Sequence, residues 1–182
     1  MNIKKMRLIY ATIILVSIGV IGGALYSLYK DLGGLDTYEI YQLQPIKRIV
    51  VGKYFKTMHS DKIIDEHILK CRELIENKKI NGELIVVHYV NDSIGAYDIE
   101  EFIGISLEED MAEIPMDFDM REYHSNKRYA VFLSMHPSVR PTTENVETLI
   151  MAKSIDLAIE LEPFFMEIYF LDNSMSIEGW IK

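Results

Sequence analysis

Glu167 is the residue whose setting most strongly indicates chemistry. It lies in the segment "FFMEIYF", residues 164–170, where every neighbour is apolar or aromatic. A carboxylate removed from water without a partner costs several kcal/mol or has its pKa raised. We therefore expect Glu167 to pair with another group, to attract a cation, or to act as a general acid or base.

The alternation of side chains along a strand assigns Glu167 to one face of a sheet. One face would hold Phe165, Glu167 and Tyr169. The other would hold only apolar residues, namely Phe164, Met166, Ile168 and Phe170. We expect the apolar set to pack beneath helices, which would leave Glu167 on a helix-free face.

An internal repeat supplies the elements around this strand. Residues 47–90 and 127–170 align at an offset of 80 without a gap, and each half reads as strand, helix and strand. The first helix is expected to begin at Ser60 and to run to about Asn77. The second should begin at Thr142 or Thr143 and stop before Pro163.

A further strand closes each half, at residues 101–107 and 175–182. The predicted fold class is α+β, with a duplicated β-α-β-β repeat and two helices on one face of an antiparallel sheet. The repeats would span residues 47–107 and 127–182 of a domain covering 46–182. The acidic segment between them has no clear periodicity and is predicted to be solvated surface.

The repeat also predicts a groove. At an offset of 80, Tyr169 pairs with Tyr89 and Glu167 pairs with Val87, so the two strands would meet around two tyrosines and one acid. We predict that Val87, Tyr89, Phe165, Glu167 and Tyr169 bind a small molecule. Trp180 either fills core or forms a wall of this groove.

Two other interpretations of Glu167 remain open. It is either a catalytic acid or base, with Tyr89 or Tyr169 polarising a substrate, or a structural carboxylate. A structural carboxylate would be exposed on an open sheet or paired with a residue such as Arg48 or Arg128.

A single membrane helix is predicted before the domain. Residues 8–29 contain no charge and are long enough to span a bilayer. Lys4, Lys5 and Arg7 precede them, so residues 1–7 should be cytoplasmic and the domain extracytoplasmic. Residues 30–45 would form a linker. The alternative is a cleaved signal peptide, although the apolar run is longer than usual. The predicted location is the cell membrane.

The charge distribution argues against a nucleic-acid partner. The whole chain carries −9, and because residues 1–35 carry +3, the remainder carries −12. Cys71 is the sole cysteine, so no intrachain disulfide can form. His67 and Cys71 have helical spacing but no third metal ligand, and no axial haem ligand stands out. We expect no metal and no cofactor.

The sequence resembles the GyrI-like small-molecule-binding family, which is related to the SOUL fold. The resemblance rests on the β-α-β-β pattern and on the strings "REYHSNKRYAVFLSMHPSV", "HYVND" and "MEIYF". It implies that Glu167 matches the family's acid at the floor of a ligand cleft, which meets cationic ligands. Some relatives are hydrolases, so the resemblance also leaves catalysis open.

The expected function is therefore a membrane-anchored domain that binds a small cationic or aromatic molecule. A hydrolase using Glu167 is one alternative. A protein-interaction module that presents the free sheet face is another, and the sequence names no protein partner.

Overall fold

The computed structural model describes residues 3–58, 61–90, 98–107, 114–125 and 127–182. Within it, contacts divide the chain into two units. One comprises Met1–Thr37 and Met135–Arg140, and the other Tyr38–Ser134 and Pro141–Lys182. Each unit is described by itself.

The first unit contains one long helix, α1 (Ile3–Asp31), and a 3-10 turn, η1 (Pro137–Val139). Residues Thr12–Asp31 have a mean hydropathy of 1.9 and are long and apolar enough to cross a membrane. The helix ends where Gly33 adopts a φ of 82°, and the N–H groups of Gly33 and Gly34 donate to the carbonyls of Lys30 and Tyr29.

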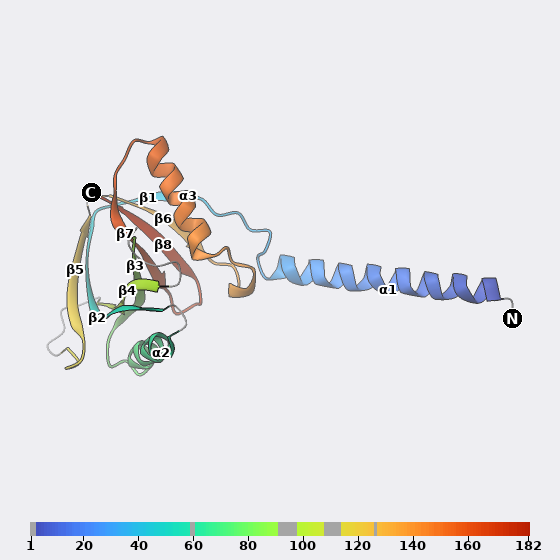
Figure 1. Ribbon diagram of the computed structural model, residues 1–182, viewed down its shortest axis with the longest axis horizontal. Helices are drawn as coiled ribbons and strands as arrows, with labels where there is room; N and C mark the ends of the chain where they lie inside the picture. The colour runs from blue at the N-terminus through green and yellow to red at the C-terminus, as the bar shows by residue number, and fades with distance from the viewer. Residues whose placement is uncertain (1–2, 59–60, 91–97, 108–113, 126) are drawn as a thin grey trace. The chain divides into compact units, whose positions relative to one another are not determined.

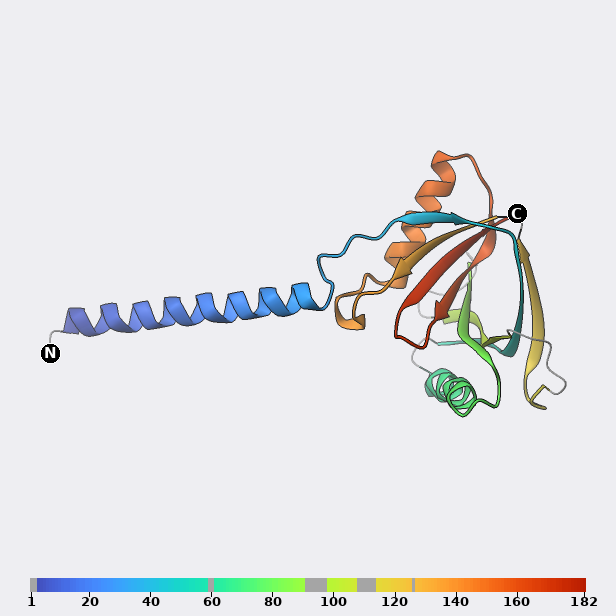
Figure 2. The same cartoon turned by 180° about the vertical axis from the view of Figure 1, so that it is seen from behind.

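The second unit is an α+β domain built on one eight-stranded antiparallel sheet, whose strands are seen in Figures 1 and 2. Its sheet order is β1-β6-β8-β7-β3-β4-β2-β5. The elements in chain order are β1 (Ile40–Leu43), β2 (Ile46–Met58), α2 (Lys62–Glu76), β3 (Gly82–Tyr89), β4 (Asp98–Leu107), β5 (Asp119–Ser125), β6 (Arg128–Leu133), α3 (Thr143–Asp156), β7 (Leu161–Tyr169) and β8 (Met175–Ile181).

The strand order has an internal correspondence. In β2-α2-β3-β4 the last strand lies between the first two, and the same holds for β6-α3-β7-β8. The two groups of strands meet where β3 pairs with β7 at the centre of the sheet.

Both long helices of the domain pack on one face of the sheet, as the sequence predicts. Cys71 of α2 lies in a buried cluster with Val86 of β3. On α3, the Thr143 hydroxyl donates to Glu167 of β7. Val86 and Glu167 are direct cross-strand partners, and such partners point to the same side. We call this side the helix-covered face.

The opposite, helix-free face is filled by side chains. Its buried cluster joins both halves of the sheet and consists of Val50, Ile85, Val87, Phe102, Tyr123, Phe164, Met166, Ile168 and Trp180. Trp180 is completely buried. The sheet therefore has a core on each face, whereas the sequence pattern predicted an open groove on this one.

Two strands were not predicted from the sequence. β1 lies in the predicted linker and pairs with β6, while β5 lies in the predicted solvated connector and pairs with β2. Both lie at the edges of the sheet. In β5 only Tyr123 and Ser125 are buried, so an edge strand with one partner shows little of the apolar pattern that identifies a strand.

The helix boundaries agree closely with the predicted ones. Thr142 caps α3 through its side chain, and Asn77 follows the end of α2. Ser60, the predicted cap of α2, lies outside the described residues, and the cap in the structure is Asp61, which accepts from the N–H of Ile63.

Replacing Asp61 with alanine should destabilise the domain by about 1 kcal/mol, because it removes the side-chain cap of α2. Urea unfolding of the full chain in detergent micelles, followed by circular dichroism, measures this. Asp61→Asn retains the capping oxygen and is the control. Equal losses in the two variants would show that the cap contributes nothing.

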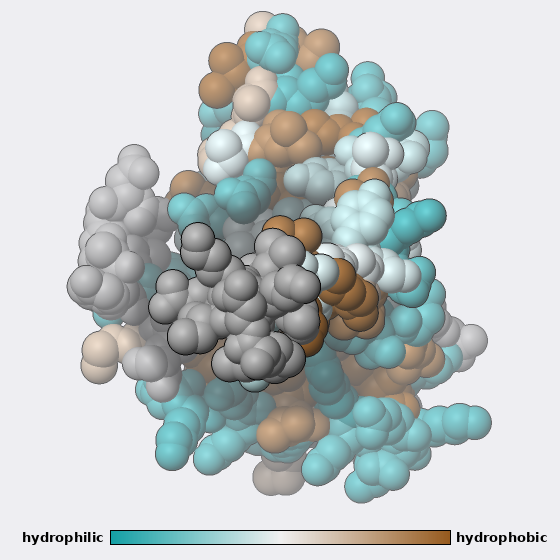
Figure 3. All heavy atoms as spheres, turned by 90° about the vertical axis from the view of Figure 1, so that its right-hand side faces the viewer, coloured by the Kyte–Doolittle hydropathy of each residue, from teal (hydrophilic) through white to brown (hydrophobic). Residues whose placement is uncertain are grey.

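The α3 helix exposes apolar side chains on its outer side. Leu149, Met151, Ile155 and Leu157 at its end are between 39% and 76% exposed. In Figure 3, hydrophobic and hydrophilic residues alternate at the top of the domain, where α3 lies. Its buried side is narrow and consists of Val146, Ile150 and Ser154.

Candidate functional site

Glu167 lies on the helix-covered face, opposite to its predicted position. Its carboxylate is 4% exposed and accepts hydrogen bonds from the hydroxyls of Thr143 and Tyr169. Thr143 begins α3, and the N-terminal end of a helix favours negative charge. The predicted helix-free face for Phe165, Glu167 and Tyr169 is therefore wrong, because the apolar side of β7 packs against the aromatic cluster of the opposite face.

A buried charge network surrounds Glu167. His88 lies between two carboxylates, with Nδ1 2.9 Å from Glu101 and Nε2 3.4 Å from Glu167. Burial alone would lower the pKa of His88, but the hydrogen bond to Glu101 and the charge of Glu167 outweigh it and raise the pKa to about 10. Burial acts to raise the pKa of Glu167, yet His88 and the two hydroxyls leave that pKa below its usual value.

This network predicts a pH dependence of stability. The pKa of the His88 imidazole is 6.5 in the unfolded chain and about 10 in the folded one, so its stabilising contribution is complete below pH 6.5. It declines as the pH rises and is lost above about pH 10. The imidazole faces three carboxyl groups, those of Glu101, Glu167 and Glu147. Burial raises the pKa of Glu147.

We expect the free energy of unfolding to fall between pH 6.5 and 9 more steeply in the wild-type chain than in His88→Gln. Urea unfolding at a series of pH values measures both slopes. His124→Gln is the control because its ring is 62% exposed. If the free energy of unfolding fell with pH equally in the wild type and in His88→Gln, the protonation of His88 in the folded chain would be contradicted.

The gapless repeat does not hold through these strands. Val87 pairs directly with Met166, and its neighbour Val86 pairs with Glu167. Val87 and Glu167 therefore point to opposite faces, although an offset of 80 requires them to share one. Only an odd offset would align residues of β3 and β7 that point to the same face. The alignment of the two halves is therefore shifted by one residue in these strands.

A continuous row of side chains crosses the helix-free face. Successive cross-strand pairs join Glu178 of β8 to Met166, Met166 to Val87, Val87 to Phe102, and Phe102 to Tyr54 of β2. The row begins at a buried carboxylate and ends at a tyrosine that is 39% exposed. It brings residues from both halves of the domain onto one surface.

Glu178 is the acid on this face. It is 2% exposed, and its carboxylate accepts from the indole N–H of Trp180 at 3.0 Å. Arg128 approaches it to 2.9 Å and Arg48 to 3.7 Å. These two arginines were the candidate partners of Glu167 in the sequence. Arg128 pairs with Glu178 instead, and Arg48 lies between Glu178 and Glu83, which it approaches to 3.4 Å, because β6 and β2 present both arginines on the helix-free face.

Aromatic rings cover the centre of the helix-free face. Phe164 lies 5.8 Å from Trp180 and 5.3 Å from Tyr123 between ring centroids, and 6.3 Å from Tyr89. The hydroxyls of Tyr89 and Tyr123 are 2.9 Å apart. The rings thus form a continuous set from the buried Trp180 to the partly exposed Tyr89.

A cation already lies among the outer rings. The guanidinium carbon of Arg121 is 4.4 Å from the ring centroid of Phe102, 5.0 Å from Tyr54 and 5.7 Å from Tyr89. Its Nη1 donates to the Tyr89 hydroxyl at 2.6 Å. We call Tyr54, Tyr89 and Phe102 the aromatic cage. Three rings at these distances attract a cation through their quadrupoles.

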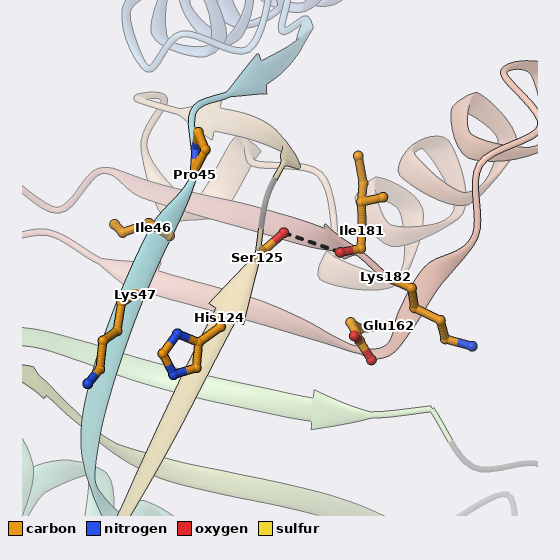
Figure 4. A pocket seen from close by; sticks show the side chains of 8 residues that line it. All are labelled: Pro45, Ile46, Lys47, His124, Ser125, Glu162, Ile181 and Lys182. Atoms are coloured by element: carbon orange, nitrogen blue, oxygen red, sulfur yellow. Dashed lines mark hydrogen bonds between the residues drawn. The ribbon is translucent and has the colours of Figure 1, made fainter.

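Among the described residues, an open depression lies where the ends of β2, β5, β7 and β8 come together, and no residue of the cage lines it. It has a volume of about 380 Å³, and Figure 4 shows the eight residues that line it. They are Pro45, Ile46, Lys47, His124, Ser125, Glu162, Ile181 and Lys182. Lys47 and Lys182 are engaged with Glu122 and Glu160. None of the predicted ligand residues lines it, and its walls are apolar and polar in about equal measure.

The structure brings together only part of the predicted site. Val87, Tyr89 and Trp180 lie on the helix-free face, while Phe165 and Glu167 lie on the helix-covered face. Tyr169 is also on the helix-covered face, where it packs against the α2 cluster.

Four residues of this surface were not predicted from the sequence: Tyr54, Phe102, Arg121 and Glu178. Glu178 had a similar signal to Glu167, because each is the lone carboxylate among largely apolar strand residues and lies two positions before an aromatic residue.

The described part of the chain contains no group of three or more residues placed to hold a metal ion. His67 Nε2 contacts the Ile103 carbonyl at 3.0 Å, and Cys71 Sγ lies 3.6 Å from the same nitrogen. Burial raises the pKa of the Cys71 thiol to about 12. His67 and Cys71 are therefore packing residues of the core beneath α2.

Neither a family model nor a curated protein matches the chain. Solved structures of EcmrR share its fold. The EcmrR–DNA complex is 13% identical, with 99% of this chain and 71% of that chain covered and a TM-score of 0.54. The EcmrR C-terminal domain is 13% identical, with 80% and 97% covered and a TM-score of 0.53. SAV2435 bound to tetraphenylphosphonium is 12% identical, with 80% and 94% covered and a TM-score of 0.49.

At these identities the similarity defines the fold alone. The EcmrR C-terminal domain has a GyrI-like fold. The expected relation to GyrI-like domains is therefore confirmed at the level of the fold.

Proposed function

We propose that this chain is a membrane-anchored domain that binds small organic cations in the aromatic cage of its helix-free face. The observation that carries the proposal is the position of Arg121, because the rings of Tyr54, Tyr89 and Phe102 already surround a cation. Rings that hold a guanidinium also suit a quaternary ammonium group. The adjoining cluster around Phe164 and Trp180 is buried, so a ligand's hydrocarbon part reaches it only when side chains of the helix-free face move apart.

The acid of the proposed site is Glu178. Because Arg48 and Arg128 already neutralise it, we expect recognition to depend more on the rings than on net charge. The predicted ligand role of Glu167 stays a prediction, and a variant of that residue tests it.

The two alternative functions have less support. A hydrolase would need Glu167 as a general acid or base near neutral pH, but the lowered pKa of Glu167 makes it a poor acid and a weak base. A protein-interaction module would present a free sheet face, whereas the centre of the helix-free face is buried and of the cage residues only Tyr54 and Tyr89 reach solvent.

The proposal is tested with phenyltrimethylammonium, a small aromatic cation, and N,N-dimethylaniline, its uncharged analogue at neutral pH. Ligand-induced changes in melting temperature of the full chain in detergent micelles are measured by circular dichroism. We expect the cation to stabilise the wild type more than the neutral analogue does. Phe102→Leu should lose this difference, because it removes the nearest ring of the cage.

Glu167→Gln is the matched variant on the other face. It should retain the response to the cation, since Glu167 does not contact the cage. Loss of the response in Glu167→Gln and its retention in Phe102→Leu would place the ligand on the helix-covered face and refute this proposal.

We also propose that α1 spans the cell membrane with its N-terminus in the cytoplasm. Its length, its hydropathy and the cationic residues before the apolar run support this. Protease added to intact cells should digest the domain. A domain that is digested only after the cells are opened would contradict the orientation, and a chain released into the medium would indicate a cleaved signal.

The internal duplication belongs to the proposal as well. The matching strand order of β2-α2-β3-β4 and β6-α3-β7-β8 supports it. Superposition of the two halves in a crystal structure of the domain should align both helices, with a one-residue shift at β3 and β7. Different helix directions relative to the strands would contradict a common origin.

A further inference from the structure

Arg121 is held by groups that would also suit a bound ligand. Its guanidinium contacts three aromatic rings and the Tyr89 hydroxyl, and that hydroxyl is in turn bonded to Tyr123. Among the described residues, the ion pairs within 4 Å do not include Arg121. A partly buried arginine is commonly paired with a carboxylate. Within the described part of the chain, the guanidinium of Arg121 is surrounded by three rings and a hydroxyl instead.

The position of Arg121 in the sheet allows it to leave. It lies in β5, the last strand of the sheet order, and is paired on one side only, with Val50 of β2. Its side chain is neither fully buried nor fully exposed, and Tyr54 beside it is 39% exposed. A rotation of this long side chain into water would open the cage without breaking any backbone pairing.

Resting on the proposed function, we propose that Arg121 is a built-in occupant of the aromatic cage, which a ligand must displace in order to bind. The guanidinium closes the site in the absence of ligand. Binding is therefore an exchange of one cation for another, and it opens the otherwise filled helix-free face.

This exchange determines which cations bind. A ligand can bind only the fraction of molecules in which Arg121 has left the cage. Its apparent dissociation constant is therefore the intrinsic one divided by that fraction. Cations that contact the rings no better than a guanidinium should fail to displace it. A quaternary ammonium group joined to an aromatic ring should succeed, because it contacts both the cage and the cluster around Phe164.

The test compares Arg121→Ala with the wild type and with Arg72→Ala, using full chains in detergent micelles. Arg72 is an exposed residue of α2, so its removal gives the same change in net charge without emptying the cage. Phenyltrimethylammonium is titrated while the fluorescence of Trp180, the single tryptophan, is recorded. We expect Arg121→Ala to bind about 5–30-fold more tightly than the other two proteins.

The possible outcomes separate this inference from the proposed function. Equal affinity of Arg121→Ala and the wild type would overturn the built-in occupant alone. An absence of binding in all three proteins would overturn the proposed function and the inference with it. A parallel titration with benzenesulfonate covers the opposite case: if the anion binds the wild type and Arg121→Ala loses it, Arg121 is a ligand contact and the exchange is refuted.

Discussion

Replacing Glu178 with alanine is expected to lower the free energy of unfolding by about 3–5 kcal/mol. The substitution leaves the buried guanidinium of Arg128 without its carboxylate at 2.9 Å, whereas Arg48 keeps Glu83 at 3.4 Å. Arg128 and Arg48 have side chains only 11% and 13% exposed, so water cannot replace the lost charge. The indole N–H of Trp180 would also lose its acceptor. Urea unfolding of the full chain in detergent micelles measures the change.

The control for this prediction is Glu122→Ala. Glu122 forms an ion pair with Lys47 at 3.1 Å, but its side chain is 43% exposed, and such pairs contribute roughly 0–1 kcal/mol. A loss in Glu178→Ala no larger than that in Glu122→Ala would contradict a buried charge centre on the helix-free face.

Trp180→Ala should be similarly destabilising, by about 3–5 kcal/mol. The indole is completely buried and contacts Phe164 and Tyr123 at centroid distances of 5.8 and 6.2 Å. Its removal would leave a cavity at the point where the two halves of the domain meet. The loss would also break the set of rings that connects the core to the cage.

Tyr41→Ala is the comparison for Trp180→Ala. Tyr41 is 49% exposed on the edge strand β1, where its main aromatic contact is Phe132 at 6.0 Å, and its loss should cost below about 1 kcal/mol. Similar losses of unfolding free energy in Trp180→Ala and Tyr41→Ala would mean that Trp180 lines an open groove in solution. That is one of the two roles that the sequence allows.

The α+β class and the helices could be predicted because they depend on local patterns. Apolar residues at helical spacing, with Thr142 before α3 and Asn77 after α2, define where the helices begin and end. The edge strands β1 and β5 could not, since pairing on one side leaves most of their residues exposed.

The face of β7 that bears Glu167 could not be predicted from its composition. The more apolar set, with Phe164 and Met166, packs against Trp180 across the helix-free face, and the set containing Glu167 packs under α3. Both sets are buried, so hydrophobicity alone does not identify the helix side. Only the pairing of Val86 with Glu167 resolves the choice, and register is a property of the assembled sheet.

Part of the site was accessible to sequence reasoning and part was not. The sequence singled out Tyr89 and Trp180, which lie in the aromatic set of the helix-free face, and their ligand role stays a prediction. Arg121 was not singled out, because it lies in a polar segment whose strand character appears only when β5 pairs with β2. Its contact with Phe102, two strands away, follows from the sheet order and has no signal in the local sequence.

The most direct test of the ligand site is a nuclear Overhauser measurement on the full chain with bound phenyltrimethylammonium. Phenylalanine and tyrosine rings are protonated in an otherwise deuterated protein, and Phe102→Leu assigns the signals of Phe102. The account predicts transfer from the ligand's N-methyl protons to the rings of Phe102, Tyr54 and Tyr89. Transfer to Phe165 and Tyr169 of the helix-covered face, with none to the cage, would contradict it.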